Sequence, residues 1–226
     1  MTKISSQPIT CSKCHHEGVF RMYETVNVTL DKSLRERVFS DDLFKWTCPE
    51  CGETFTIVYP FLYHDMDNGF MIHFSPDDCE SINEQYQEML TKFPGMKRGT
   101  YRTTNALVRL KEKILIFEAG LDDVVIELAK VFTKYDDANK LPDKCSLVFQ
   151  DLITGKEDSS KEFLVFKSFV NHEPQKGILL ISREQYNQYA LIAESEFRLT
   201  RYCETVNEKW ILQRMKQNDL DSKAKK

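Results

Sequence analysis

Cys48-Pro49-Glu50-Cys51-Gly52 repeats the Cys-x-x-Cys spacing of Cys11-Ser12-Lys13-Cys14, and these two pairs set the fold of the first part of the chain. Two tight turns, or knuckles, that each aim two thiolates at one point are the usual construction of a four-cysteine zinc site. In the second knuckle, Pro49 presets one φ angle and Gly52 can adopt a left-handed conformation. The first knuckle has neither residue at these places, although Gly18 follows soon after. We expect one structural zinc ion, held by Cys11, Cys14, Cys48 and Cys51.

Paired cysteines have three other common uses. Disulfides suit secreted chains, and residues 1–10 contain no apolar segment typical of a signal peptide. A redox-active pair opens a helix, whereas Cys51 leads into residues 54–59, which have the pattern of a strand. Iron is the remaining alternative, because four thiolates also suit this metal. Zinc is the preferred interpretation, and iron stays open.

The other potential ligands are two histidines and three isolated cysteines. His15 and His16 follow Cys14 directly, but four cysteines already fill a tetrahedral shell. We expect these histidines to be exposed, or one of them to donate a hydrogen bond to a sulfur. Cys79, Cys145 and Cys203 show no pair spacing, so we expect them to be small buried residues without a chemical role.

Length and composition indicate one sizeable core or two small ones. The 226 residues are 41% hydrophobic and carry a formal charge of −4, and the pI is about 5.8. An acidic chain is a poor candidate for a dedicated nucleic-acid-binding protein, because affinity for phosphate comes from cationic side chains. No apolar run reaches the length of a membrane span. We therefore expect a cytoplasmic protein that does not bind membranes.

Hydrophobic patterning predicts an α+β fold, with a zinc-ribbon-like β unit and a helical hairpin. Strands are predicted at residues 19–30, 54–62 and 70–74, with a hairpin turn at Asn68-Gly69. Asp31 and a capping box from Ser33 to Glu36 predict a short helix. Three further helices are predicted, the first from Ser75-Pro76 to Pro94, the second at residues 105–118 and ending at Gly120, and the third after Asp122 or Asp123.

The charged segment 136–144 contains Pro142 and is the predicted domain boundary. Beyond it, strands are predicted at residues 146–153, 163–170 and 177–182, and helices at 183–193 and 201–216, the first of these with a capping box from Ser182 to Gln185. We therefore expect a knuckle domain at residues 1–135, a small α+β unit at 136–216 and a disordered tail at 217–226.

The chain resembles the CpXC-domain family, which is named for two Cys-Pro-x-Cys knuckles. The second knuckle matches this pattern fully, and the first has Ser12 in place of proline. Two further stretches resemble the family, Tyr59-Pro60-Phe61-Leu62-Tyr63-His64-Asp65-Met66 and the helical segment from Tyr101-Arg102 to Leu121-Asp122-Asp123. The resemblance covers about residues 10–135. It implies a metal-binding knuckle domain and assigns no activity.

Nucleic-acid binding is the second candidate function. Residues 97–113 are locally basic, and Tyr101 lies among the cationic residues, as a base-stacking side chain would. Arg98, Tyr101 and Arg102 are the predicted contacts with nucleic acid or with another partner. The competing interpretation is a solvated helix face with its entry loop, balanced by the acidic residues 122–123 and 136–137.

Catalysis by His64 and Asp65 is the third candidate, since an imidazole beside a carboxylate can act as an acid–base pair. Neighbouring residues on a strand point to opposite faces, so we favour a structural role for Asp65 and Asn68 in a hairpin turn. We assign no catalytic residue. The leading hypothesis is a non-catalytic module that binds an unknown protein partner, with four aromatic residues shared between core and surface: Phe61, Tyr63, Phe70 and Phe74.

Overall fold

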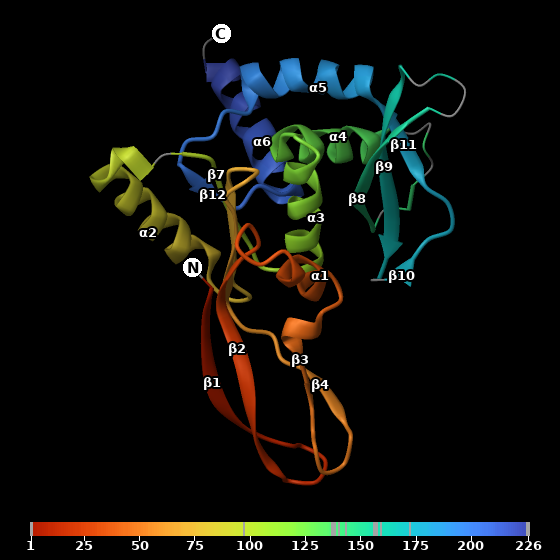
Figure 1. The fold of residues 1–226 in the computed structure, drawn as a ribbon. Helices are drawn as coiled ribbons and strands as arrows, with labels where there is room; N and C mark the ends of the chain where they lie inside the picture. Colours follow the sequence, from red (N-terminus) through yellow and green to blue (C-terminus); the bar gives the residue numbers. More distant parts are fainter. Residues whose placement is uncertain are drawn as a thin grey trace. The chain divides into compact units, whose positions relative to one another are not determined.

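The computed structural model describes residues 2–96, 98–136, 139, 141–142, 144–155, 158, 160–171 and 173–224 (Figure 1). Contacts within the chain divide it into two compact units, Met1–Lys111 (unit 1) and Glu112–Lys226 (unit 2). The division lies inside helix α3 (Leu107–Glu118), upstream of the boundary predicted at residues 136–144. That boundary stays a prediction, and four of its residues lie outside the described part: Asp137, Ala138, Lys140 and Asp143. The predicted α+β class is confirmed.

Unit 1 contains a mixed sheet in which five strands lie in the order β1, β2, β5, β6, β7. The strands are β1 (Lys3–Thr10), β2 (Glu17–Asn27), β5 (Phe61–Asp65), β6 (Phe70–Phe74) and β7 (Thr100–Thr104). The pairs β1–β2 and β5–β6 are antiparallel, whereas β2–β5 and β6–β7 are parallel. The predicted turn at Asn68-Gly69 joins β5 to β6, and Gly69 has a φ of 67°. The sequence patterns missed β1 and β7.

Two hairpins carry the cysteine knuckles and lie side by side (Figure 1). The first is formed by β1 and β2, and the second by β3 (Lys45–Thr47) and β4 (Thr54–Thr56). Trp46 stacks on Phe55 with 6.0 Å between ring centroids. The same Trp46 ring lies directly over Gly18, where an added Cβ would come within 2.6 Å of it. The absence of a side chain at Gly18 therefore lets the two hairpins approach each other.

An aromatic cluster anchors these hairpins in the core of unit 1. The Phe44 ring lies 5.5 Å from Tyr59 and 5.3 Å from Phe61, centroid to centroid. The buried Tyr59 hydroxyl donates to the carbonyl of Leu43 at 2.9 Å and accepts from the backbone N–H of Tyr23 at 3.2 Å. Four aromatic residues predicted to reach the surface are instead fully buried, so that expectation is wrong: Phe61, Tyr63, Phe70 and Phe74. They occupy alternate positions of β5 and β6 that face the same layer.

Two local predictions in unit 1 are corrected. The strand predicted at residues 54–62 is two strands, because β4 ends at Thr56 and β5 begins at Phe61, with Pro60 just before it. Proline has no N–H for a sheet ladder, which favours the interruption. Helix α1 (Ser33–Phe39) has no capping box, since Asp31 accepts from both the backbone N–H and the hydroxyl of Ser33.

The helices of unit 1 otherwise follow the sequence patterns. A 3₁₀ turn, η1 (Asp42–Phe44), precedes β3. Helix α2 (Cys79–Lys92) begins after Asp78, whose carboxylate accepts from the N–H of Ser81 at 2.9 Å, and η2 (Pro94–Met96) follows it. The start of α2 is therefore later than the predicted Ser75-Pro76.

Unit 2 packs helices against a second sheet around one hydrophobic core. Its elements after α3 are α4 (Asp123–Tyr135), β8 (Cys145–Thr154), β9 (Glu162–Val170), β10 (Glu173–Pro174), β11 (Leu179–Ser182), α5 (Arg183–Glu196), β12 (Cys203–Glu204) and α6 (Glu208–Ala224). Asp122 caps α4, and Ser182 with Gln185 forms the predicted capping box of α5. Helix α6 runs through residues 217–224 of the predicted tail, and Lys225 and Lys226 lie outside the described residues.

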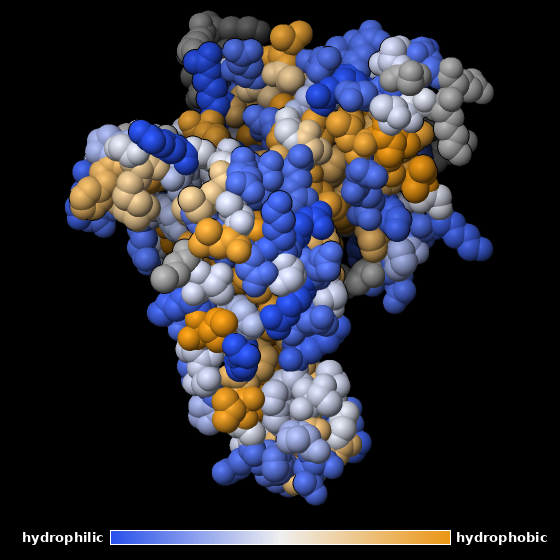
Figure 2. Space-filling model, viewed as in Figure 1, coloured by the Kyte–Doolittle hydropathy of each residue, from blue (hydrophilic) through white to orange (hydrophobic). Residues whose placement is uncertain are grey.

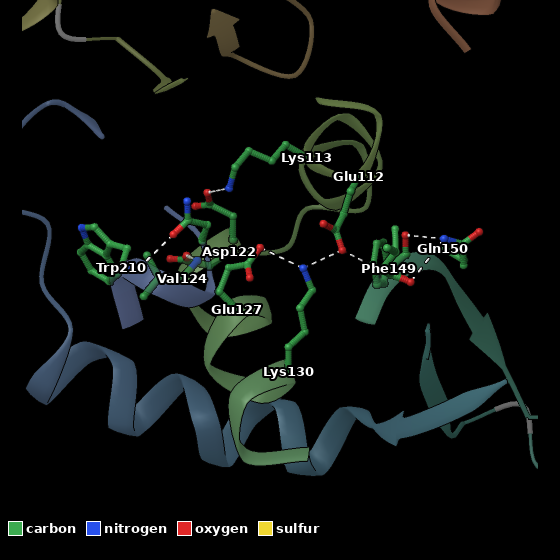
Figure 3. A network of polar contacts seen from close by, with 12 residues as sticks. Glu112, Lys113, Asp122, Val124, Glu127, Lys130, Phe149, Gln150 and Trp210 are labelled. Carbon is green, nitrogen blue, oxygen red and sulfur yellow. Dashed lines mark hydrogen bonds and ion pairs between the residues drawn. The ribbon is translucent and has the colours of Figure 1, made fainter. Parts of the chain in front are cut away.

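Charged side chains of α3 and α4 are buried in unit 2 (Figure 3). Lys130 of α4 contacts Glu112 at 2.6 Å and Glu127 at 2.9 Å, and Glu112 also accepts from the backbone N–H of Phe149 at 2.6 Å. Lys113 pairs with Asp123 at 2.5 Å. Since a buried charge is costly without partners, these contacts constrain how α3, α4 and β8 pack.

Candidate metal centre

The two knuckles have the same backbone hydrogen bonds. In the first, Cys11 N donates to the His16 carbonyl and His15 N donates to the Cys11 carbonyl, both at 2.9 Å. In the second, Cys48 N donates to the Glu53 carbonyl at 2.8 Å and Gly52 N donates to the Cys48 carbonyl at 2.9 Å. His15 and Gly52 occupy equivalent places, with φ angles of 61° and 71°. His15 therefore takes the left-handed conformation that the sequence analysis assigned only to a glycine.

This repeated geometry brings the four predicted cysteines together. Their Sγ atoms all lie within 4.8 Å of one another. The Sγ atoms of Cys11 and Cys51 are 3.7 Å apart, and those of Cys14 and Cys48 are 3.6 Å apart. A tetrahedron with metal–sulfur bonds of about 2.3 Å has sulfur–sulfur edges of about 3.8 Å. The donor set thus fits one tetrahedral metal ion, and the closest contacts join one knuckle to the other.

A disulfide does not account for the cluster. Sulfur atoms in a disulfide are about 2.05 Å apart, and none of the seven cysteines, all of which lie in the described part of the chain, forms one. Cys11 and Cys48 are buried, whereas Cys14 is exposed and Cys51 is partly exposed. The first cysteine of each knuckle thus faces the protein and the second faces solvent.

The protein environment separates the acidities of these thiols. Burial raises the pKa of Cys11, but hydrogen bonds from the backbone N–H groups of Cys14 and Lys13 and from neighbouring thiols outweigh it and lower the pKa to about 7. For Cys14, the hydrogen bond from the backbone of His16 lowers the pKa, but partial loss of hydration and the neighbouring cysteines raise it to about 12. A bound cation would favour the thiolate form of all four residues.

Lys13 connects the knuckles from the outside. Its Nζ atom lies 2.7 Å from a carboxylate oxygen of Glu53. The pKa of Lys13 is raised by this hydrogen bond first, and also by the negative charge of Cys51 and Cys11. A four-thiolate zinc centre has a formal charge of −2, so a nearby ammonium group opposes part of the charge that the cluster carries.

The predicted nucleic-acid contacts do not share one surface. Arg98 is exposed, but Tyr101 and Arg102 belong to β7 and are buried. The Tyr101 hydroxyl donates to the carbonyl of Met96 at 2.5 Å, and Arg102 donates to the carbonyl of Tyr101 at 2.8 Å. The aromatic ring is therefore not presented to a base, and the guanidinium group is not presented to solvent.

The basic stretch around these residues is largely neutralised within each unit. In unit 1, Lys111 contacts Asp41 and the carbonyl of Phe39. In unit 2, Lys113 is buried against Asp123. Lys97 lies outside the described residues. Charge counted along the sequence thus overstates the positive charge available to a phosphate backbone.

His64 and Asp65 point to opposite sides of β5. Asp65 is buried, and its carboxylate accepts from the backbone N–H and the side-chain amide of Asn68, at 3.0 and 2.8 Å. The pKa of His64 is lowered by burial and by the positive N-terminus, while Asp65 raises it. The predicted structural role of Asp65 and Asn68 in the hairpin is confirmed.

The isolated cysteines mostly match their prediction. Cys145 and Cys203 are buried, and burial raises the pKa of Cys145. Cys79 is half-buried, and its sulfur lies 3.6 Å from the carbonyl oxygen of Ser75. Of the two histidines, His15 is exposed and His16 is half-buried.

A family comparison agrees with the cysteine geometry. The model of the CpXC protein family matches residues 9–130, which include both knuckles. No protein of curated function and no solved structure matches the chain. None of the described helices is both long and apolar enough to span a bilayer. Because the matched region is more than half of the 226 residues, the chain belongs to the CpXC protein family.

Proposed function

We propose that this protein is a non-catalytic zinc-binding protein whose four-cysteine site joins two hairpins into one ribbon. The observation that supports it most is the equivalence of the knuckles, which bring the sulfurs of Cys11, Cys14, Cys48 and Cys51 to the spacing of a tetrahedral thiolate shell. Four cysteine ligands leave no open position for a substrate or water. A structural ion is therefore favoured over a catalytic one.

The ribbon has few other sources of stability. Strand β1 is mostly exposed, and β3 and β4 contain three residues each. Isolated two-stranded hairpins are marginally stable in water. Structural zinc contributes on the order of 10–16 kcal/mol in small zinc-dependent domains. The metal would thus determine whether the tips of the two hairpins fold.

The proposed role of the ribbon is to present a surface to a protein partner in the cytoplasm, where reduced cysteines suit metal binding. Nucleic-acid binding is the weaker alternative, since Arg98 is the only exposed member of its predicted set. Catalysis by His64 and Asp65 is weaker still, because Asn68 already occupies the Asp65 carboxylate. Absence of oligonucleotide binding at low salt would remove the nucleic-acid alternative, since electrostatic affinity is greatest there.

Replacement of one ligand tests the proposed function. Cys48→Ser should lose the zinc and unfold the hairpin tips at residues 11–16 and 48–53, measured by elemental analysis and by hydrogen exchange of those residues. Cys79→Ser is the matched control, since Cys79 is in unit 1 but outside the cluster. It should keep one zinc ion per chain. Full zinc occupancy with native-like melting in Cys48→Ser would contradict the proposal. Iron instead of zinc in the purified protein would show that the site holds the alternative metal.

A further inference from the structure

Strand β11 of unit 2 is an edge strand without the usual protection of an edge. It pairs with β9 from Leu179 opposite Phe166 to Ser182 opposite Phe163. Strand β8 pairs along the other side of β9, and within the described residues no strand pairs with the second side of β11. Proline, lysine and bulges commonly block pairing at an edge. The sequence Leu-Leu-Ile-Ser of β11 has none of these.

The edge strand of unit 1 provides a contrast. Strand β1 pairs only with β2 and is also mostly exposed. It contains Lys3 and Pro8 and has a register shift beside Lys3. All three features discourage the addition of another strand. The two exposed edges of this chain therefore differ in their capacity to accept a partner.

The sheet of unit 2 has apolar residues on both faces. One face belongs to the hydrophobic core, through residues such as Phe149, Phe166 and Ile181. On the other face, Val165 lies opposite Leu180. Val165 is only 8% exposed although it is not part of that core cluster. Figure 2 shows hydrophobic residues gathered over β9 and β11. Leu180 of β11 is 47% exposed, and Ile178, just before the strand, is 58% exposed.

We infer that β11 pairs with β11 of a second copy of this chain, antiparallel and across a two-fold axis. A strand of identical sequence satisfies the edge, because it offers both the backbone hydrogen-bonding groups and the apolar side chains that the edge presents. The two copies would then share one continuous sheet, with their apolar faces joined at Leu180.

The charges beside β11 support a second copy as the occupant. Lys176 precedes Leu180 by four residues, and Glu184 follows it by four. Antiparallel pairing places the start of one β11 beside the end of the other, so Lys176, three residues before one strand, and Glu184, the second residue of α5 in the other copy, lie at the same end of the joined strands. Both side chains are exposed, and neither has an ion-pair partner among the described residues. Opposite charges at the two ends of β11 favour antiparallel pairing of two copies over parallel pairing.

The dimer should be weak because the paired strands are short. We expect a dissociation constant of about 1–100 µM, within the range of small transient interfaces. Sedimentation velocity of the full chain over a concentration series measures it. Leu180→Lys places two ammonium groups at the axis and should weaken the dimer at least about tenfold. Leu191→Lys is the matched control, because Leu191 is 70% exposed on α5, and it should leave the dimer intact.

A charge exchange separates pairing from a general effect on folding. Lys176→Glu alone should weaken the dimer, and the double variant Lys176→Glu with Glu184→Lys should restore it, because the exchanged charges still attract. A monomeric wild-type chain at about 200 µM would overturn the inference. An unchanged dimer in Leu180→Lys would overturn it as well. Zinc content should be the same in all these variants, so the outcome is independent of the metal proposal.

Discussion

The equivalence of the two knuckles predicts that His15→Gly stabilises the protein. His15 and Gly52 have φ angles of 61° and 71° and make the same backbone hydrogen bond to the first cysteine of their knuckle. Glycine populates this left-handed region without the steric conflict that a Cβ creates. The side chain of His15 is exposed, so its removal deletes little packing.

The magnitude follows from two opposing effects. A left-handed conformation costs a residue with a Cβ about 1–2 kcal/mol, whereas glycine adds about 0.4–1 kcal/mol of conformational entropy to the unfolded chain. His15→Gly should therefore raise the free energy of unfolding by about 0.5–1 kcal/mol. Gly52→Ala should lower it by a similar amount or more. A Cβ at Gly52 meets no atom within 4 Å, so this loss reports the backbone conformation and no clash.

Chemical denaturation of the zinc-loaded protein at a fixed concentration of free zinc measures both variants, because the apparent stability depends on that concentration. The double variant His15→Gly with Gly52→Ala should lie near the wild type, since the two sites are separate turns. A destabilised His15→Gly protein would refute the reasoning. So would a neutral Gly52→Ala substitution, because it would show that the left-handed conformation carries no cost there.

Four further substitutions test the cores and the pH dependence. Lys130→Met leaves Glu112 and Glu127 buried without their cation and should cost about 3–5 kcal/mol in thermal or chemical denaturation. Lys92→Met removes an exposed helix pair and should cost no more than about 0.5 kcal/mol; equal losses would contradict the burial of the network. Tyr59→Phe leaves the backbone N–H of Tyr23 and the carbonyl of Leu43 buried without their partner, and it should lower the free energy of unfolding by about 1–3 kcal/mol in the same assay. A neutral result would contradict these hydrogen bonds. Burial lowers the pKa of His73, so the folded state loses stability as the pH falls below the ordinary value of 6.5. In denaturation at several pH values, His73→Gln should lose less stability than the wild type over that range. An unchanged pH profile would argue against this reasoning.

Local signals predicted the cysteine cluster and several element ends. Cys-x-x-Cys spacing needs only a tight turn, so Cys11, Cys14, Cys48 and Cys51 could be identified without a tertiary structure. Asp122, Gly120 and the Ser182–Gln185 capping box were also predictable, because a cap depends on residues within a few positions. The left-handed conformation of His15 was not, since a histidine at that place gives no signal of it.

Signals that depend on distant partners were misread. Strand β1 is polar and contains Pro8, so its pairing with β2 has no trace in hydrophobic alternation. Strand β7 was missed, because Arg102 and the threonines beside it normally indicate a solvent-exposed segment. In the structure Thr103 donates to Asn83 at 2.9 Å, and both residues are buried. The burial of Lys113 and Lys130 is likewise visible only once their carboxylate partners are in place.

The central claim is that four cysteines hold one structural zinc ion, and the metal content of the protein purified without added metal tests it most directly. Elemental analysis should find one zinc ion per chain, and removal of that ion by a chelator should unfold the hairpin tips at residues 11–16 and 48–53. A protein that contains iron, or that keeps a native-like melting transition with no metal and all seven thiols reduced, would contradict the account.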